Sequence, residues 1–156
     1  MAFPEIVAAL TALPADAVLD CELVVVNQRG HPVWASMRRR AMISRSSWAI
    51  DAAQNEPAML CAFDLLACDG VDARDLPLVE RKVRLADVVV DVPGVQIVGH
   101  LEAHGEALFG QVVELGLEGI VGKRADSPYR AGRQPTWIKI KNQDYARREA
   151  LRFRSR

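Results

Sequence analysis

Trp137-Ile138-Lys139-Ile140-Lys141 is the most informative stretch of this sequence, because apolar and basic side chains alternate along it. In a β-strand this alternation places Ile138 and Ile140 on one face, toward a core, and Lys139 and Lys141 on the other. Two ammonium groups on one face repel each other unless an anion lies between them. The pattern therefore predicts either a phosphate-binding strand or the solvated outer face of a half-buried sheet.

Carboxylates mark a second β-rich segment, residues 17–27. Alternation places Asp20 and Glu22 on one face of this strand, with apolar residues on the other. Such a pair can hold a divalent metal, a ribose or a basic group. Charges that protect an exposed strand edge from aggregation are the alternative.

Two further segments combine strand character with functional side chains. Phe63 is followed by a carboxylate in an apolar run. It is either a stacking surface for a purine base or an ordinary aromatic residue of the core. In segment 118–124, Glu118 and Lys123 fall on opposite faces, and its glycines would let a ligand approach the backbone.

Composition limits the class of protein. The chain has 156 residues, 50% of them hydrophobic, which is enough for one packed domain. The sequence has neither an apolar run long enough to cross a membrane nor a secretion signal at its start. The unpaired set Cys21, Cys61 and Cys68 argues against a disulfide scaffold or zinc site and predicts a cytoplasmic protein. The net charge is zero, so any contact with phosphates must be local. The basic C-terminal end favours a contact with an anionic partner there.

The periodicity of apolar residues predicts the secondary structure. Helices are expected over residues 4–13, 36–43, 78–90 and 104–115. Strands are expected over residues 17–27, 31–34, 58–67, 95–101, 118–124 and 136–142, the first two as a hairpin. The polar stretch 44–56 gives no clear prediction. This order indicates an α+β fold with largely antiparallel sheets flanked by helices.

In this order the segments resemble the motifs of ATP-dependent DNA ligases, closest to the bacterial ligases associated with end joining. Residues 19–24 resemble the third motif of the family, residues 63–66 with Asp69-Gly70 the aromatic motif, residues 118–124 the fourth and residues 137–141 the fifth. The resemblance implies a partial nucleotidyltransferase (ligase adenylation) fold over residues 1–142. Residues 143–156 then form a basic C-terminal tail.

In such ligases a lysine attacks the α-phosphate of ATP, the AMP passes to a 5′-phosphate at a DNA nick, and the 3′-hydroxyl displaces it. The resemblance implies that Phe63 stacks on adenine and that Lys139 and Lys141 neutralise the α-phosphate. It implies that Glu118 contacts the nucleotide and that Glu22 and Glu118 serve Mg²⁺ or another divalent cation. ATP and nicked double-stranded DNA are the expected partners, with no membrane.

The family's nucleophile lies in a Lys-x-Asp-Gly motif that this sequence does not contain. Its four lysines are all in other contexts, and Asp69-Gly70 is preceded at the required place by Ala67. No catalytic residue is therefore assigned, because no other group in this sequence is positioned to form the phosphoramide. We expect a truncated adenylation domain without the nucleophile segment and the C-terminal oligonucleotide-binding domain, with a missing N-terminal segment or partner chain. The alternative is a non-catalytic remnant that binds nucleotide or nucleic acid.

Overall fold

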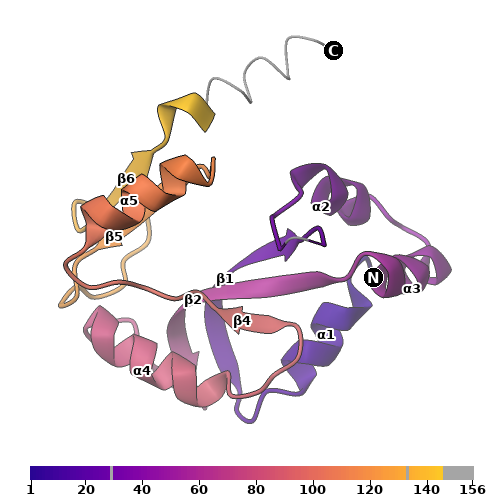
Figure 1. Ribbon diagram of the computed structural model, residues 1–156. Coiled ribbons are helices and arrows are strands. Elements are labelled where there is room, and N and C mark those ends of the chain that lie inside the picture. The colour runs from indigo at the N-terminus through magenta and orange to yellow at the C-terminus, as the bar shows by residue number, and fades with distance from the viewer. Residues whose placement is uncertain (29, 133, 146–156) are drawn as a thin grey trace.

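A long antiparallel strand pair forms the centre of the fold (Figure 1). In the computed structural model, which describes residues 1–28, 30–132 and 134–145, β1 (Ala17–Val25) pairs along its length with β2 (Ala58–Cys68). After a tight turn, β3 (Val71–Asp72) continues antiparallel to β2, and β4 (Val95–Ile97) runs parallel to β2. The sheet is thus mostly antiparallel, as predicted.

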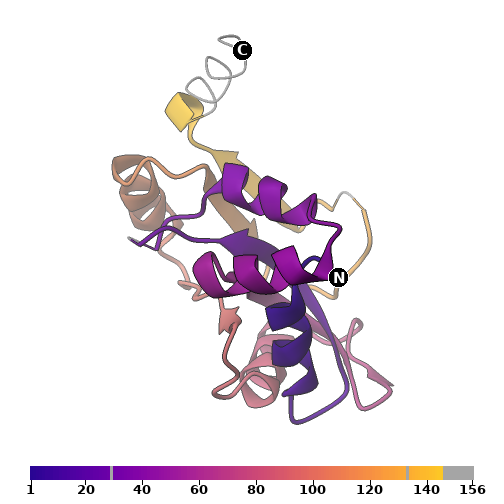
Figure 2. The same cartoon turned by 90° about the vertical axis from the view of Figure 1, so that its right-hand side faces the viewer.

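Helices surround this sheet. α1 (Pro4–Thr11) and α4 (Leu78–Val88) pack against it, and α2 (Trp34–Ala41) and α3 (Ser46–Asn55) connect β1 to β2 (Figures 1 and 2). Within the described residues, no helix has the length and hydropathy needed to cross a membrane.

A second, two-stranded sheet follows in the chain. β5 (Gly119–Lys123) and β6 (Trp137–Lys141) are antiparallel, and α5 (Gly105–Glu114) packs against β5. Gly116 ends α5 with a positive φ of 66°, and the N–H of Leu117 donates to the carbonyl of Val112. This closing hydrogen bond is the one expected where glycine follows a helix.

The core lies on one face of the central sheet. Leu19 and Cys21 of β1 pack against a buried cluster that includes Leu65 of β2 and Leu85 of α4. Farther along β1, Leu23 packs against a second buried cluster, formed by Ile6 of α1, Val25 and Ala58. The predicted apolar face of β1 is therefore confirmed.

Helices predicted near 4–13, 36–43, 78–90 and 104–115 are confirmed, as are strands near 17–27, 58–67, 118–124 and 136–142. The strand predicted at 31–34 does not form among the described residues: the pairing there is a Val26–Pro32 bridge with a hydrogen bond from the N–H of Val33 to the carbonyl of Val25, and Trp34 begins α2. Pro32 has no N–H with which to extend a ladder. The strand predicted at 95–101 ends at Ile97, and the unassigned stretch 44–56 contains α3. Most of the predicted basic tail, from residue 146 onward, lies outside the described residues.

One packing expectation is also wrong. Ile138 and Ile140 do not form a core, since they are 61% and 42% exposed. The reason is that α5 packs against the neighbouring strand, β5. At Gly119 a side chain would lie 2.2 Å from the carbonyl oxygen of Ile140, so this glycine allows β6 to approach.

Candidate functional site

An irregularity in β2 places Phe63 at the site. The register pairs Asp20 with Asp64 and Cys21 with Ala62, so Phe63 has no partner in β1. Ala62 lies in the core, whereas the Phe63 ring is only partly buried. An extra residue of this kind bends a strand and changes the direction of its side chain. Phe63 therefore faces away from the regular ladder.

The ammonium group of Lys123 lies close to two aromatic rings. Its Nζ atom is 3.9 Å from the centre of the Trp137 ring and 6.0 Å from the centre of the Phe63 ring. Burial lowers the pKa of Lys123, although the nearby carboxylates of Asp64 and Asp20 act in the opposite direction. Lys123, at the end of β5, and Trp137, at the start of β6, thus form a cationic and aromatic cluster with Phe63.

Three lysines share one face of the second sheet. Lys123 lies opposite Trp137, Val121 opposite Lys139, and Gly119 opposite Lys141, and side chains directly opposite each other share a face. Successive positions on one face are about 7 Å apart along a strand. Lys123, Lys139 and Lys141 therefore form a row that begins at the aromatic cluster. Lys139 and Lys141 are both exposed, which suits contact with a ligand.

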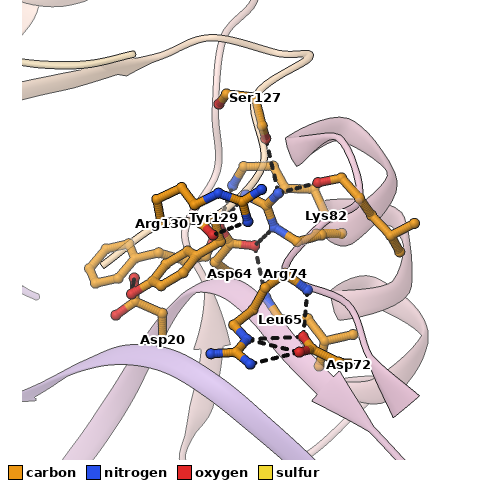
Figure 3. Close-up of polar contacts among 12 residues, drawn as sticks. Asp20, Asp64, Leu65, Asp72, Arg74, Lys82, Ser127, Tyr129 and Arg130 are labelled. Carbon is orange, nitrogen blue, oxygen red and sulfur yellow. Dashed lines mark hydrogen bonds and ion pairs between the residues drawn. The ribbon is translucent and has the colours of Figure 1, made fainter. Parts of the chain in front are cut away.

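A buried ion pair involves Asp64, the residue that follows Phe63 in β2 (Figure 3). The Nε and Nη2 atoms of Arg81 donate to the two carboxylate oxygens of Asp64 at 2.8 and 2.9 Å, and both side chains are fully buried. The Nη1 atom of Arg81 also donates to the carbonyl of Ser127 at 3.0 Å. Two residues later, the hydroxyl of Tyr129 reaches the Asp20 carboxylate at 3.5 Å. One guanidinium thus joins β2, α4 and the loop between β5 and β6.

Lys82, the next residue of α4, contacts the same point of β2. Its Nζ atom donates to the main-chain carbonyl of Phe63 at 3.2 Å. Burial lowers the pKa of Lys82, while the charge of Asp64 partly offsets this effect. The consecutive residues Arg81 and Lys82 therefore hold the consecutive residues Phe63 and Asp64.

The two carboxylates expected to bind a metal ion lie in different surroundings. Glu118 forms an ion pair with Lys141, with 3.2 Å between the carboxylate oxygen and Nζ, whereas Glu22 is exposed on β1. In the described residues, no group of three or more His, Cys, Asp or Glu side chains is arranged to hold a metal ion. Mg²⁺ needs only one or two carboxylates when phosphate oxygens and water supply the other ligands. The donor chemistry of these two residues fits that arrangement.

A separate open pocket is lined in part by Tyr129. It has a volume of about 380 Å³ and is lined by Leu66, Asp72, Arg74, Asp75, Tyr129, Arg130 and Ala131. Its two arginines are already paired, Arg74 with Asp72 at 2.7 Å and Arg130 with Asp75 at 2.6 Å. These ion pairs neutralise both arginines of the pocket. In the lysine row, the ion pairs of the described residues involve only Lys141, with Glu118, so that row is the better site for an anion.

Sequence reasoning assigned no site role to Lys123, Trp137 or Lys82. Trp137 precedes Lys139 by two residues, so alternation already placed it on the lysine face. The approach of Lys123 to Phe63 depends on contacts between the two sheets, which no local pattern encodes. Lys82 stands in a helix whose amphipathic pattern indicated packing only.

The chain is similar to ATP-dependent DNA ligases over most of its length. The family model of the ATP dependent DNA ligase domain matches residues 1–141. The SPbeta prophage-derived DNA ligase-like protein LigB of Bacillus subtilis is 34% identical over 134 residues, which cover 85% of this chain and 47% of that protein. The multifunctional non-homologous end joining protein LigD of Pseudomonas aeruginosa is 33% identical over 127 residues, 80% of this chain and 14% of that protein.

A solved structure supports the same assignment. The structure of mycobacterial DNA ligase D complexed with ATP and MES matches with a TM-score of 0.66 and 28% identity, covering 87% of this chain and 41% of that one. The chain spans about half or less of the length of these relatives. The expected α+β ligase adenylation fold is confirmed. The chain belongs to the family of ATP-dependent DNA ligase domains.

Proposed function

We propose that this chain binds ATP as the adenylation-domain part of a bacterial DNA ligase. The adenine lies against Phe63, and the phosphates extend along Lys123, Lys139 and Lys141. The observation that carries the proposal is the position of the Lys123 ammonium, 3.9 Å from the centre of the Trp137 ring, 6.0 Å from that of Phe63, and at the head of the lysine row. The mycobacterial relative, whose structure contains ATP, supports the choice of nucleotide.

The proposed chemistry suits the charges of the site. Transfer of a phosphoryl-type group depends mainly on positioning and on neutralising charge. Lys139 and Lys141 neutralise the α-phosphate, and Glu22 and Glu118 would supply carboxylate ligands to Mg²⁺, which would neutralise further phosphate charge. Nicked double-stranded DNA is the proposed acceptor of the adenylate, in cytoplasmic DNA repair. The named end-joining relative supports this role.

A second candidate function is binding without chemistry. It is favoured by one observation, that none of the four lysines of this sequence stands in a Lys-x-Asp-Gly motif. In this alternative, the same cluster and lysine row hold nucleotide or nucleic acid, and no covalent intermediate forms on this chain.

Calorimetric titration with ATP tests the proposed site. Each charge-assisted contact contributes roughly 1.5–3 kcal/mol, so Lys139→Met and Lys141→Met should each weaken ATP binding about ten-fold or more. Phe63→Leu should also weaken binding, because it removes the stacking surface. Arg84→Met, an exposed change on α4, is the control, and circular dichroism verifies folding. Equal binding by both lysine variants and the wild type would instead identify the lysine row as a solvated face.

A further inference from the structure

The main chain at Phe63 lacks the constraint that a regular strand would provide. Phe63 is the extra residue of β2 opposite the Asp20–Cys21 step of β1, so the β1–β2 ladder leaves it unpaired. At such an irregularity the ladder is locally disrupted and does not fix the extra residue. Contacts from outside the β1–β2 ladder must therefore fix the direction of the ring.

α4 supplies the contact at this point. Arg81 and Asp64 are both fully buried and share two hydrogen bonds, which fixes the helix against β2. Because of this anchor, the side chain of Lys82 reaches the carbonyl of Phe63 at 3.2 Å. Lys82 is only partly buried, so its ammonium group has given up part of its hydration for this position.

We propose that Lys82 is a positioning residue that sets the direction of the Phe63 ring through the Phe63 carbonyl. The proposal deepens the proposed function, on which it rests, because Phe63 is the surface assigned to adenine. A purely electrostatic role is the competing explanation, since the Lys82 charge also lies close enough to Lys123 to lower the pKa of that side chain. The two roles differ in whether they require a hydrogen-bond donor or a charge.

The direct test observes the ring without any nucleotide. The chain has four phenylalanines, so 4-fluorophenylalanine labelling gives a simple ¹⁹F NMR spectrum in which Phe63→Leu identifies the Phe63 resonance. Lys82→Met removes the donor and the charge, whereas Lys82→Gln keeps a donor without the charge. We expect the Phe63 resonance to shift and broaden in Lys82→Met and to remain near its wild-type position in Lys82→Gln and in the control Arg84→Met. An unchanged resonance in Lys82→Met would overturn the proposal.

ATP titration then tests the consequence for binding. Loss of one hydrogen bond of ordinary net strength should weaken ATP binding about five-fold in Lys82→Met, and Lys82→Gln should restore most of it. In the Phe63→Leu background, Lys82→Met should have no further effect, because the two residues act together. Equal weakening by the Met and Gln variants would show that Lys82 acts through its charge, against the proposal. If the wild type binds no ATP, the proposed function fails, while the ¹⁹F comparison still decides the role of Lys82.

Discussion

Arg81 and Asp64 form an ion pair near the site in which both charged side chains are fully inaccessible to solvent. A buried ion pair adds little net stability, but removing one partner leaves the other charged and unpaired in the interior. We therefore expect Arg81→Leu to lower the free energy of unfolding by about 3–5 kcal/mol. The double variant Arg81→Leu/Asp64→Leu should recover most of this loss. Urea unfolding measures the free energy of unfolding of both variants. A double variant less stable than the single one would contradict this explanation.

Glu5 gives the fold a specific sensitivity to acid. Burial alone would raise the pKa of Glu5, but hydrogen bonds from buried Arg40 and from the N–H of Ala58 outweigh it and lower the pKa below its ordinary value of 4.5. A carboxylate with a lowered folded pKa adds stability that is present above the unfolded pKa and is lost as the pH falls through the folded pKa. Glu5→Gln should thus be less stable than the wild type at pH 6. The gap between their free energies of unfolding should close on acidification below about pH 4.5. Chemical unfolding across this range measures the gap, and a gap independent of pH would exclude the ion pair as its cause.

At the scale of elements, β1 is paired along its length on one side only within the described part of the chain. Its partner along the whole strand is β2, and on the other side the described residues add little beyond the Val26–Pro32 bridge. Exposed strand edges favour association, and a lysine at the edge discourages it. We expect concentration-dependent association in size-exclusion chromatography, reduced by Val18→Lys on β1. Val83→Lys, at a similarly exposed valine on α4, is the matched control. A compact monomer at all concentrations would contradict the prediction.

The elements also show how far local patterns predict structure. α4 and β2 have clear periodicity and were predicted well, because their apolar residues face one core. α3 was missed because only Ala49 is buried, so its apolar pattern is weak. Ile138 and Ile140 alternate as a buried strand should, yet their burial depends on whether another element covers β6, and local sequence carries no information about that.

At the scale of the whole molecule, the site depends on contacts between distant segments. The family motifs predicted Phe63, Glu118, Lys139 and Lys141 as site residues, and the structure pairs Glu118 with Lys141 at 3.2 Å. Their roles in binding remain predictions. The cluster of Phe63 with Lys123 joins β2 to β5, and the contact from Lys82 depends on the packing of α4. Such contacts require the three-dimensional arrangement of both sheets.

The absence of a Lys-x-Asp-Gly motif from this sequence leads to a prediction about the chain as a whole. A lysine in the correct position is needed to form the covalent phosphoramide, so this 156-residue chain should not become adenylated. Incubation with radiolabelled ATP and magnesium, followed by denaturing electrophoresis, should leave the protein band unlabelled. A band that survives denaturation and disappears on substitution of one of the four lysines would refute the prediction.

The central claim is that the cluster of Phe63, Lys123 and Trp137 forms the adenine nucleotide site. A crystal structure of the chain with bound ATP tests it most directly. We predict that the adenine ring stacks on Phe63 with carbon atoms about 3.5–4.0 Å apart, and that the phosphates lie beside Lys123 and Lys139. ATP bound in the pocket between Arg74 and Arg130, with Phe63 free of nucleotide, would contradict the claim.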